Sequence, residues 1–388
     1  MMMLVVVVLL LLVLCNVSSS LSSLSSSSLS SLSSSLWNDT CQHYNYRQIE
    51  YDQPGMHIVC VKPNDDSTIN ISVLVNGSVE RQFHYSKDYG DTEPLLAFLY
   101  DQIGTSNNRQ VYDWGIFSYE GQIVWSIARM AFEETTFIFT NGIWMFPGVK
   151  VGHEQYAYDG KNSIKVTTLS LRPLVLRAFD FLGPAECEYI IDKSEPEMLP
   201  SPTVKMDQDV DLPDTTWRTS TQHFLDSEGD DIITAIDVRT AKITRTRRAM
   251  QEPVQVLRYK PGEKYDQHTD YFDARFYQND PSTLKLIRNG ENNRLITVLW
   301  YMTNVTEGGE TIFPKAFGGR GHPLDDGTTN CNDRPDALKV KPVQGDVIVF
   351  YSLYADGSVD EHSLHAACPV GANQIKYAAN KWIWTQDK

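Results

Sequence analysis

The second half of the chain contains several short apolar runs of strand length, and these runs limit the folds open to it. They follow two segments with helical periodicity, Ala185–Asp192 and Asp231–Ile243. The runs are Val254–Tyr259, Leu295–Met302, Asp346–Tyr351 and Lys381–Trp384. Short strands that follow helices are typical of an antiparallel β barrel or sandwich with helices packed on one side. No GxGxxG, GxSxG or Walker loop occurs, so a nucleotide-binding fold has little support.

The first part of the chain is also strand-rich, and we expect a separate domain over residues 37–165. Alternating apolar residues over Ile69–Tyr85, with Asn76-Gly77 at the centre, predict a β-hairpin with a type I′ turn. The same pattern recurs over Thr136–Phe146. A short helix is predicted over Pro94–Ile103, with proline near its start and glycine directly after it. This region holds no cluster of potential ligands, which favours a structural or interaction role.

The N-terminus begins with an apolar segment that runs from Met1 to Cys15. It matches the apolar region of a signal peptide, although no Lys or Arg precedes it, and it is shorter than the ~20 residues that span a bilayer. We expect a signal peptide over residues 1–19, with an uncleaved membrane anchor as the alternative. Residues 20–36 consist almost entirely of Ser and Leu, which is typical of a flexible spacer.

The cysteines and glycosylation sequons fit a secretory route, in which disulfides form. Five cysteines follow the apolar segment: Cys41, Cys60, Cys187, Cys331 and Cys368. Cys41 and Cys60 are a plausible local pair, and the odd count leaves a free thiol or an intermolecular bridge. Sequons occur at Asn38, Asn70, Asn76 and Asn304. The formal net charge of −15 argues against nonspecific binding of nucleic acid.

One segment carries residues with the spacing of metal ligands. On a strand, His268 and Asp270 project to the same face and offer a nitrogen and an oxygen to one metal. A second histidine from a distant strand would complete a set that suits non-haem iron(II) and leaves positions for a cosubstrate and O2. His365 follows a predicted strand and loop, and His362 is its alternative. Lys376 lies eleven residues after His365, where it could pair with the far carboxylate of a dicarboxylic acid.

Taken in order, these segments resemble the catalytic domain of plant and algal prolyl 4-hydroxylases over about Leu169–Trp384. The matching stretches are Glu186–Ile191, Trp217–Ser220, Val254–Tyr259, Tyr259–Phe272, Arg294–Tyr301, Glu307–Thr311, Gly345–Tyr351, Ser363–Val370 and Lys381–Trp382. The resemblance implies a mainly β fold with flanking helices, the double-stranded β-helix or jelly roll, over residues 169–388. It also implies an iron(II)- and 2-oxoglutarate-dependent dioxygenase. Such an enzyme hydroxylates peptidyl proline at C4, consumes O2, releases succinate and CO2, and uses ascorbate to restore iron(II).

The resemblance also assigns roles to individual residues. The iron ligands it implies are His268, Asp270 and His365, whose Ala-Ala-Cys-Pro-Val context selects it over His362. The residues it implies for the C5 carboxylate of 2-oxoglutarate are Lys376, Tyr259 and Thr311. Those it places along the peptide groove are Arg294, Trp382 and Tyr265. The implied partner is a proline-rich peptide or protein in the lumen of the endoplasmic reticulum or Golgi.

The sequence departs from the family pattern at several points. The spacing from the distal histidine to Lys376 is one residue longer than usual, and Trp384 stands where many members place a histidine near the peptide. Residues 280–293 differ from the expected substrate-covering loop. Cys331 and Cys368 are expected either to form a disulfide beside the site or to leave Cys368 as a buried thiol. These departures keep two alternatives open, an oxygenase for another substrate and a secreted binding protein without activity.

Overall fold

The computed structural model describes residues 53–64, 68–76, 79–86, 90–104, 113–133, 135–209, 211, 217–316, 331 and 337–388. The expected signal peptide or anchor, the Ser/Leu tract, Cys41 and the glycine-rich insert that contains His322 lie outside these residues. Within them, no helix has both the length and the apolar character needed to cross a bilayer.

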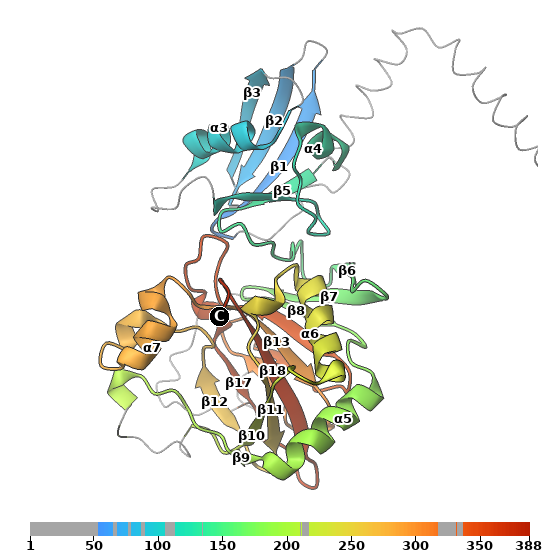
Figure 1. Ribbon diagram of the computed structural model, residues 1–388, viewed down its shortest axis with the longest axis vertical. Coiled ribbons are helices and arrows are strands. Elements are labelled where there is room, and N and C mark those ends of the chain that lie inside the picture. The colour runs from blue at the N-terminus through green and yellow to red at the C-terminus, as the bar shows by residue number, and fades with distance from the viewer. Residues whose placement is uncertain are drawn as a thin grey trace, which may run out of the picture.

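The N-terminal part is a five-stranded antiparallel sheet with two helices (Figure 1). Its strand order is β3-β2-β1-β5-β4. The elements are β1 (Met56–Pro63), β2 (Thr68–Val75), β3 (Val79–Ser86), α3 (Glu93–Ile103), β4 (Gly115–Phe117), α4 (Ile127–Glu133) and β5 (Thr135–Phe139). Pairing of Val75 with Val79 confirms the first predicted hairpin, but three positions separate these residues, whereas the expected type I′ turn has two. Alternate residues such as Val59 and Ile71 pack against Leu95 of α3, because every second side chain of a strand faces the same way.

The second predicted hairpin, over Thr136–Phe146, is wrong. Strand β5 ends at Phe139, and residues 143–146 form no strand. Both edges of β5 are already paired, with β1 and with β4. The apolar run Trp144–Phe146 is buried instead in a core shared with the second sheet, and the Phe146 amide donates to the Tyr351 hydroxyl. This run is therefore apolar because it joins the two parts of the molecule.

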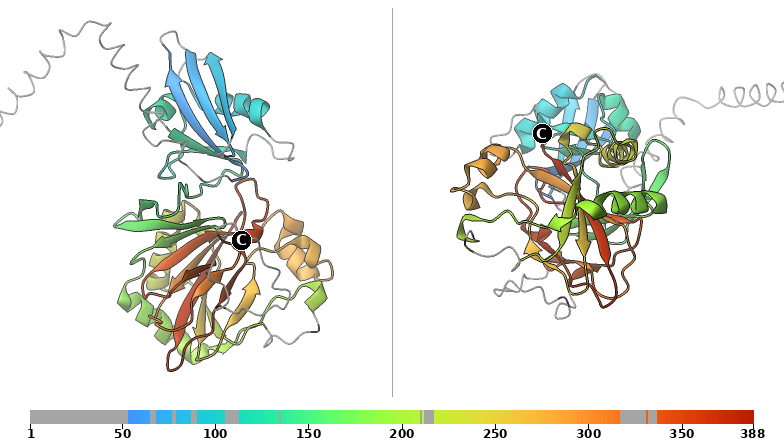
Figure 2. Two further views of the ribbon diagram at one scale, coloured as in Figure 1. Left: turned by 180° about the vertical axis from the view of Figure 1, so that it is seen from behind. Right: turned by 60° about the horizontal axis from the view of Figure 1, so that its bottom comes forward.

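The C-terminal part consists of two facing sheets that form a jelly roll, with helices on the outside (Figures 1 and 2). The larger sheet has the order β6-β7-β8-β16-β13-β18-β11-β10-β9, and the smaller has the order β12-β17-β14-β15. The large-sheet strands are β6 (Glu154–Tyr158), β7 (Ser163–Leu171), β8 (Leu174–Ala178), β9 (Leu199–Pro200), β10 (Thr221–Leu225), β11 (Val254–Tyr259), β13 (Arg294–Tyr301), β16 (Val347–Tyr351) and β18 (Lys376–Trp384). The small-sheet strands are β12 (Tyr265–His268), β14 (Thr311–Phe313), β15 (Leu338–Val340) and β17 (His365–Ala367).

Helices α5 (Pro184–Ser194) and α6 (Asp231–Thr244) cover the outer face of the large sheet. Asp230 caps α6 by accepting the backbone N–H groups of Ile232 and Ile233, which would otherwise lack partners. Helix α7 (Pro281–Leu286) lies on the opposite side of the jelly roll (Figure 2). Short 3-10 helices span Glu195–Glu197, Asp207–Asp209, Arg248–Met250, Ala274–Phe276, Arg288–Gly290 and Glu361–Ser363. Because the helices cover the outer face, a site can form between the inner face of the large sheet and the small sheet that faces it.

The expected boundary between the two parts, at residues 165–169, falls inside β7. Strand β7 pairs with β8, with Val166 opposite Ala178, and β6 pairs with β7. Backbone hydrogen bonds therefore join residues 154–171 to the large sheet rather than to the N-terminal one. The two parts also contact each other directly, because the Asp356 amide donates to the Pro54 carbonyl and the Thr140 hydroxyl donates to the Ala355 carbonyl.

Candidate metal centre and cosubstrate pocket

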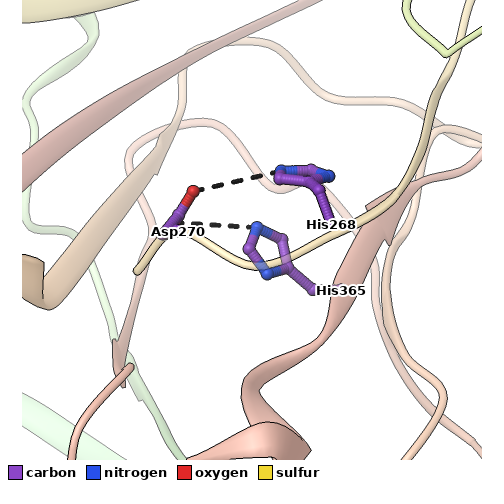
Figure 3. A group of neighbouring side chains, drawn as sticks. All are labelled: His268, Asp270 and His365. Carbon is purple, nitrogen blue, oxygen red and sulfur yellow. Dashed lines mark ion pairs between the residues drawn. The ribbon is translucent and has the colours of Figure 1, made fainter. Parts of the chain in front are cut away.

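Three potential metal ligands converge on the inner side of the small sheet (Figure 3). His268 ends β12 and pairs directly with His365, which begins β17, while Asp270 follows β12 by two residues. The His365 Nε2 atom lies 3.7 Å from Asp270 Oδ2, and His268 Nε2 lies 4.0 Å from Asp270 Oδ1. All three ligand atoms lie within 4.8 Å of one another. Strand pairing thus brings together residues that are almost one hundred positions apart.

Backbone carbonyl groups orient the two histidine side chains for metal binding. The Nδ1 atoms of His268 and His365 lie 2.8 Å from the Asp266 carbonyl and 2.9 Å from the Ser363 carbonyl. A carbonyl only accepts, so each Nδ1 carries the proton and each Nε2 presents its lone pair to the site. Burial lowers the pKa of His268 to about 3, which keeps this imidazole neutral. Two imidazole nitrogens and one carboxylate oxygen form the donor set that suits non-haem iron(II).

His362, the alternative distal ligand, lies outside this cluster. Its Nδ1 atom is 3.1 Å from Asp360 Oδ1, and 36% of its side chain is exposed to solvent. The group of three ligand atoms found among the described residues contains His365 and not His362. The geometry therefore favours His365 at the metal.

A small pocket adjoins the two histidines and is lined by Lys376, Tyr259 and Thr311. Lys376 begins β18 opposite Tyr259 of β11, and its amine is fully buried. The Lys376 Nζ donates to the Gly309 carbonyl at 2.7 Å and lies 5.3 Å from the centre of the Tyr259 ring. Burial lowers the pKa of Lys376 to about 7. A dicarboxylic acid with one end at the histidines would place its other carboxylate beside this amine.

The expected groove residues line a larger cleft, with a volume of about 550 Å³, that opens beside His268 and Asp270. Tyr265 stacks on the His268 ring, with 3.6 Å between ring centres. The Arg294 guanidinium lies 3.5 Å above the centre of the Trp382 ring. The structure thus places these three residues in the lining of the cleft next to the metal centre, Tyr265 on the small sheet and Arg294 and Trp382 on the large sheet.

Several neighbours of the site were not identified from the sequence. Thr297 donates to Asp270 Oδ2 at 2.6 Å, and Tyr301 donates to the Thr311 hydroxyl at 2.8 Å. Both lie on β13, two strand repeats apart, so they face the same side of the sheet. They alternate with Val298 and Trp300, which face the opposite core, and this period of two could have identified them once the inner face of the strand was known.

The departures noted in the sequence have structural counterparts. Residues 371–375 form a turn in which Asn373 has a positive φ of 61°, and this turn accommodates the longer spacing before Lys376. Trp384 is buried and does not line the cleft. Cys331 and Cys368 form a disulfide beside β17. Cys60 is also disulfide-bonded, while Cys187 is a free, buried thiol.

Comparison with known proteins agrees with this geometry. A model of the 2OG-Fe(II) oxygenase superfamily matches residues 254–384. The chain is 34% identical over 219 residues to probable prolyl 4-hydroxylase 6 of Arabidopsis thaliana, which covers 56% of this chain and 72% of that protein. This chain belongs to the prolyl 4-hydroxylase family. Prolyl 4-hydroxylase 13 of the same plant is also 34% identical, over 56% of this chain and 73% of its own length.

Family membership makes the protein an iron(II)- and 2-oxoglutarate-dependent dioxygenase. Among solved structures, a viral collagen prolyl hydroxylase from Paramecium bursaria Chlorella virus-1, in complex with 2OG, is 24% identical. That match covers 54% of this chain and 95% of the viral chain, with a TM-score of 0.37. The superfamily model matches only residues of the C-terminal part, so the N-terminal sheet lies outside the region that it matches.

Proposed function

We propose that the protein hydroxylates proline residues of peptides or proteins to 4-hydroxyproline, with 2-oxoglutarate and O2 as cosubstrates. One observation carries this proposal. The cluster of His268, Asp270 and His365 lies between a pocket that contains a buried lysine and a cleft lined by aromatic side chains. The buried amine of the pocket suits a carboxylate of the cosubstrate, the donor set of the cluster suits iron, and the aromatic lining of the cleft suits an extended peptide.

The chain's own residues hold and orient the reactants. His268, Asp270 and His365 would hold iron(II), which supplies the oxidation of a C–H bond coupled to decarboxylation of 2-oxoglutarate. Lys376 would pair with the C5 carboxylate, while Tyr259 and Thr311 complete that end of the pocket. Thr297 keeps the Asp270 carboxylate in place through its hydrogen bond.

The composition of the cleft supports a proline-rich substrate. Aromatic side chains line it, among them Trp217, Phe224, Tyr265, Tyr271, Phe272, Tyr277 and Trp382. Aromatic grooves suit the extended polyproline II conformation, because proline rings pack flat against aromatic faces.

The proposal is tested by assaying the purified protein with iron(II), 2-oxoglutarate and ascorbate on polyproline-like and collagen-like peptides. We expect succinate and hydroxyproline to form together, and Asp270→Ala to form neither. Succinate without stimulation by any proline peptide would instead favour an oxygenase for another substrate, an alternative raised by Trp384 and by helix α7 within the changed loop. Lack of iron affinity in the wild type would favour a binding protein without activity.

We further propose that the protein acts in the secretory pathway, in the endoplasmic reticulum or Golgi lumen, with ascorbate as reductant. Disulfide-bonded Cys60, Cys331 and Cys368 support an oxidising compartment. Asn304 is the described sequon most suited to carry a glycan, because it lies exposed in a loop. Asn70, by contrast, is only half-exposed within the N-terminal sheet, where its side chain is hydrogen-bonded to Asn64. Digestion with an N-glycosidase, followed by mass mapping of secreted protein, tests these assignments.

A further inference from the structure

Strand β18 presents a row of alternate side chains that runs from the cosubstrate pocket to the end of the cleft. Lys376, Ala378 and Asn380 line the pocket, and Asn380 and Trp382 line the cleft. Trp384 is the next residue of the same period, so its side chain points to the same side of the sheet. It lines neither cavity, and only 1% of its surface is exposed. The role of this buried indole must therefore lie in its contacts with neighbouring side chains.

The Trp384 indole N–H donates to the buried carboxylate of Glu252, with a distance of 2.7 Å from Nε1 to Oε1. The same Oε1 atom accepts from Nε of Arg294 at 2.7 Å, and Glu252 Oε2 accepts from Arg294 Nη2 at 3.2 Å. The Arg294 guanidinium in turn lies flat on Trp382, which forms part of the cleft wall. Three buried or half-buried groups, Glu252, Arg294 and Trp382, therefore connect Trp384 to the cleft.

These contacts fix the Glu252 side chain, which would otherwise have several orientations. Apart from the indole, the Glu252 carboxylate is held by the Arg294 guanidinium and by an ion pair with Lys388 at 3.9 Å, and both of these partners are flexible side chains. The indole N–H of Trp384 approaches Glu252 from a rigid ring that also stacks on Phe272. The plane of the Glu252 carboxylate is thereby fixed, and with it the plane in which Arg294 covers Trp382.

We propose that Trp384 is a positioning residue for the peptide substrate, acting through Glu252 and Arg294. This inference rests on the proposed function, since it concerns the affinity of the same cleft for a proline peptide. Trp384 touches neither the iron ligands nor the pocket of Lys376. Loss of its N–H should therefore weaken peptide binding while leaving the use of 2-oxoglutarate unchanged.

The test compares Trp384→Phe with the wild type in peptide-dependent turnover. Phenylalanine keeps an aromatic ring beside Phe272 but has no N–H. We expect the KM for the peptide to rise about tenfold, the effect of losing one charge-assisted hydrogen bond, with the KM for 2-oxoglutarate unchanged. Trp384→His, which keeps a ring N–H, should restore part of the affinity. Trp300→Phe is the matched control, because Trp300 is equally buried and its N–H has no partner among the described residues.

A double-mutant cycle with Glu252→Gln decides whether Trp384 acts through Glu252. We expect Trp384→Phe to add little to the rise in peptide KM that Glu252→Gln causes by itself. Additive effects, or a peptide KM in Trp384→Phe equal to that of Trp300→Phe, would overturn the inference. If the wild type itself shows no peptide-stimulated turnover, the proposed function fails first, and the positioning role fails with it.

Discussion

The amine of Lys376 donates a 2.7 Å hydrogen bond to the carbonyl of Gly309, a neutral acceptor inside a buried pocket. No carboxylate among the described residues forms an ion pair with this amine. Burial therefore lowers its pKa to about 7. A cosubstrate carboxylate beside the amine would raise that pKa again, so binding above pH 7 requires uptake of a proton.

The first prediction concerns this proton. The KM for 2-oxoglutarate should rise between pH 7 and pH 9, by up to about tenfold per pH unit, because a growing fraction of Lys376 is neutral before binding. Lys376→Ala should mainly raise the 2-oxoglutarate requirement. The Lys376→Arg variant keeps its positive charge at these pH values. If it binds 2-oxoglutarate, its KM for this cosubstrate should not change with pH. Steady-state kinetics across this range test the idea, and a KM independent of pH in the wild type would refute it.

The metal ligands provide the second prediction. His268→Ala, Asp270→Ala and His365→Ala should each abolish turnover, because two remaining ligands hold iron(II) poorly. His362→Ala is the matched control, since His362 is adjacent in sequence but lies outside the cluster. Iron titration and turnover of all four variants test the assignment. Loss of iron binding in His362→Ala with retention in His365→Ala would reverse it.

Thr297 provides a third prediction. Its hydroxyl donates to Asp270 Oδ2 at 2.6 Å, which fixes one oxygen of the carboxylate. Thr297→Val keeps the side-chain shape but removes the donor, and we expect iron affinity to fall about 10- to 100-fold. Thr297→Ser keeps the hydroxyl and should bind iron nearly as well as the wild type. Equal affinities in the valine and serine variants would show that this hydrogen bond has no role at the metal.

The disulfide between Cys331 and Cys368 closes a loop between residues 37 positions apart. Cross-linking such a loop limits the unfolded chain, so replacing both cysteines with serine should cost about 3–4 kcal/mol of stability. Thermal unfolding measures this effect. Cys187→Ser changes a buried thiol outside any disulfide and is the control for substitution itself. An unchanged Tm in the double variant would mean that the bond contributes no stability.

His57 makes the N-terminal sheet sensitive to acid. Burial lowers the pKa of His57 to about 4, below its unfolded value of about 6.5. The unfolded chain therefore binds a proton that the folded sheet does not, and stability falls as the pH decreases from 6.5 to 4. The full loss is about 3 kcal/mol. Hydrogen exchange of β1 amides should show this loss, and His57→Asn should remove it. His84→Gln, at an exposed position of the same sheet, should leave it unchanged.

Much of the catalytic part could be predicted from sequence because its signals are local or follow the strand period. The spacing of His268 and Asp270 required only that alternate strand residues share a face, and the segment Val254–Tyr259 is a strand with the expected bounds. His268 and His365 come together because β12 pairs with β17. The sequence has no local signal for this pairing, and only the family resemblance placed His365 at the same metal.

Other features depend on partners that are remote in sequence. The run Trp144–Phe146 was expected to form a strand, yet its apolar side chains fill the junction between the two parts. Strand β6 was missed because its exposed tyrosines, Tyr156 and Tyr158, alternate with few strongly apolar residues. Trp384 stands where many family members place a histidine near the peptide, whereas here its side chain is buried and donates a hydrogen bond to Glu252. None of these contacts has a local signature in the sequence.

The most direct test of this account is the stoichiometry of product formation on a proline-rich peptide. With iron(II), 2-oxoglutarate, ascorbate and O2, the wild type should form one hydroxyproline for each succinate above the peptide-free rate, measured by mass spectrometry of the peptide. Asp270→Ala should form neither product. Succinate that never exceeds the peptide-free rate, with no peptide gaining an oxygen atom, would contradict the proposed activity.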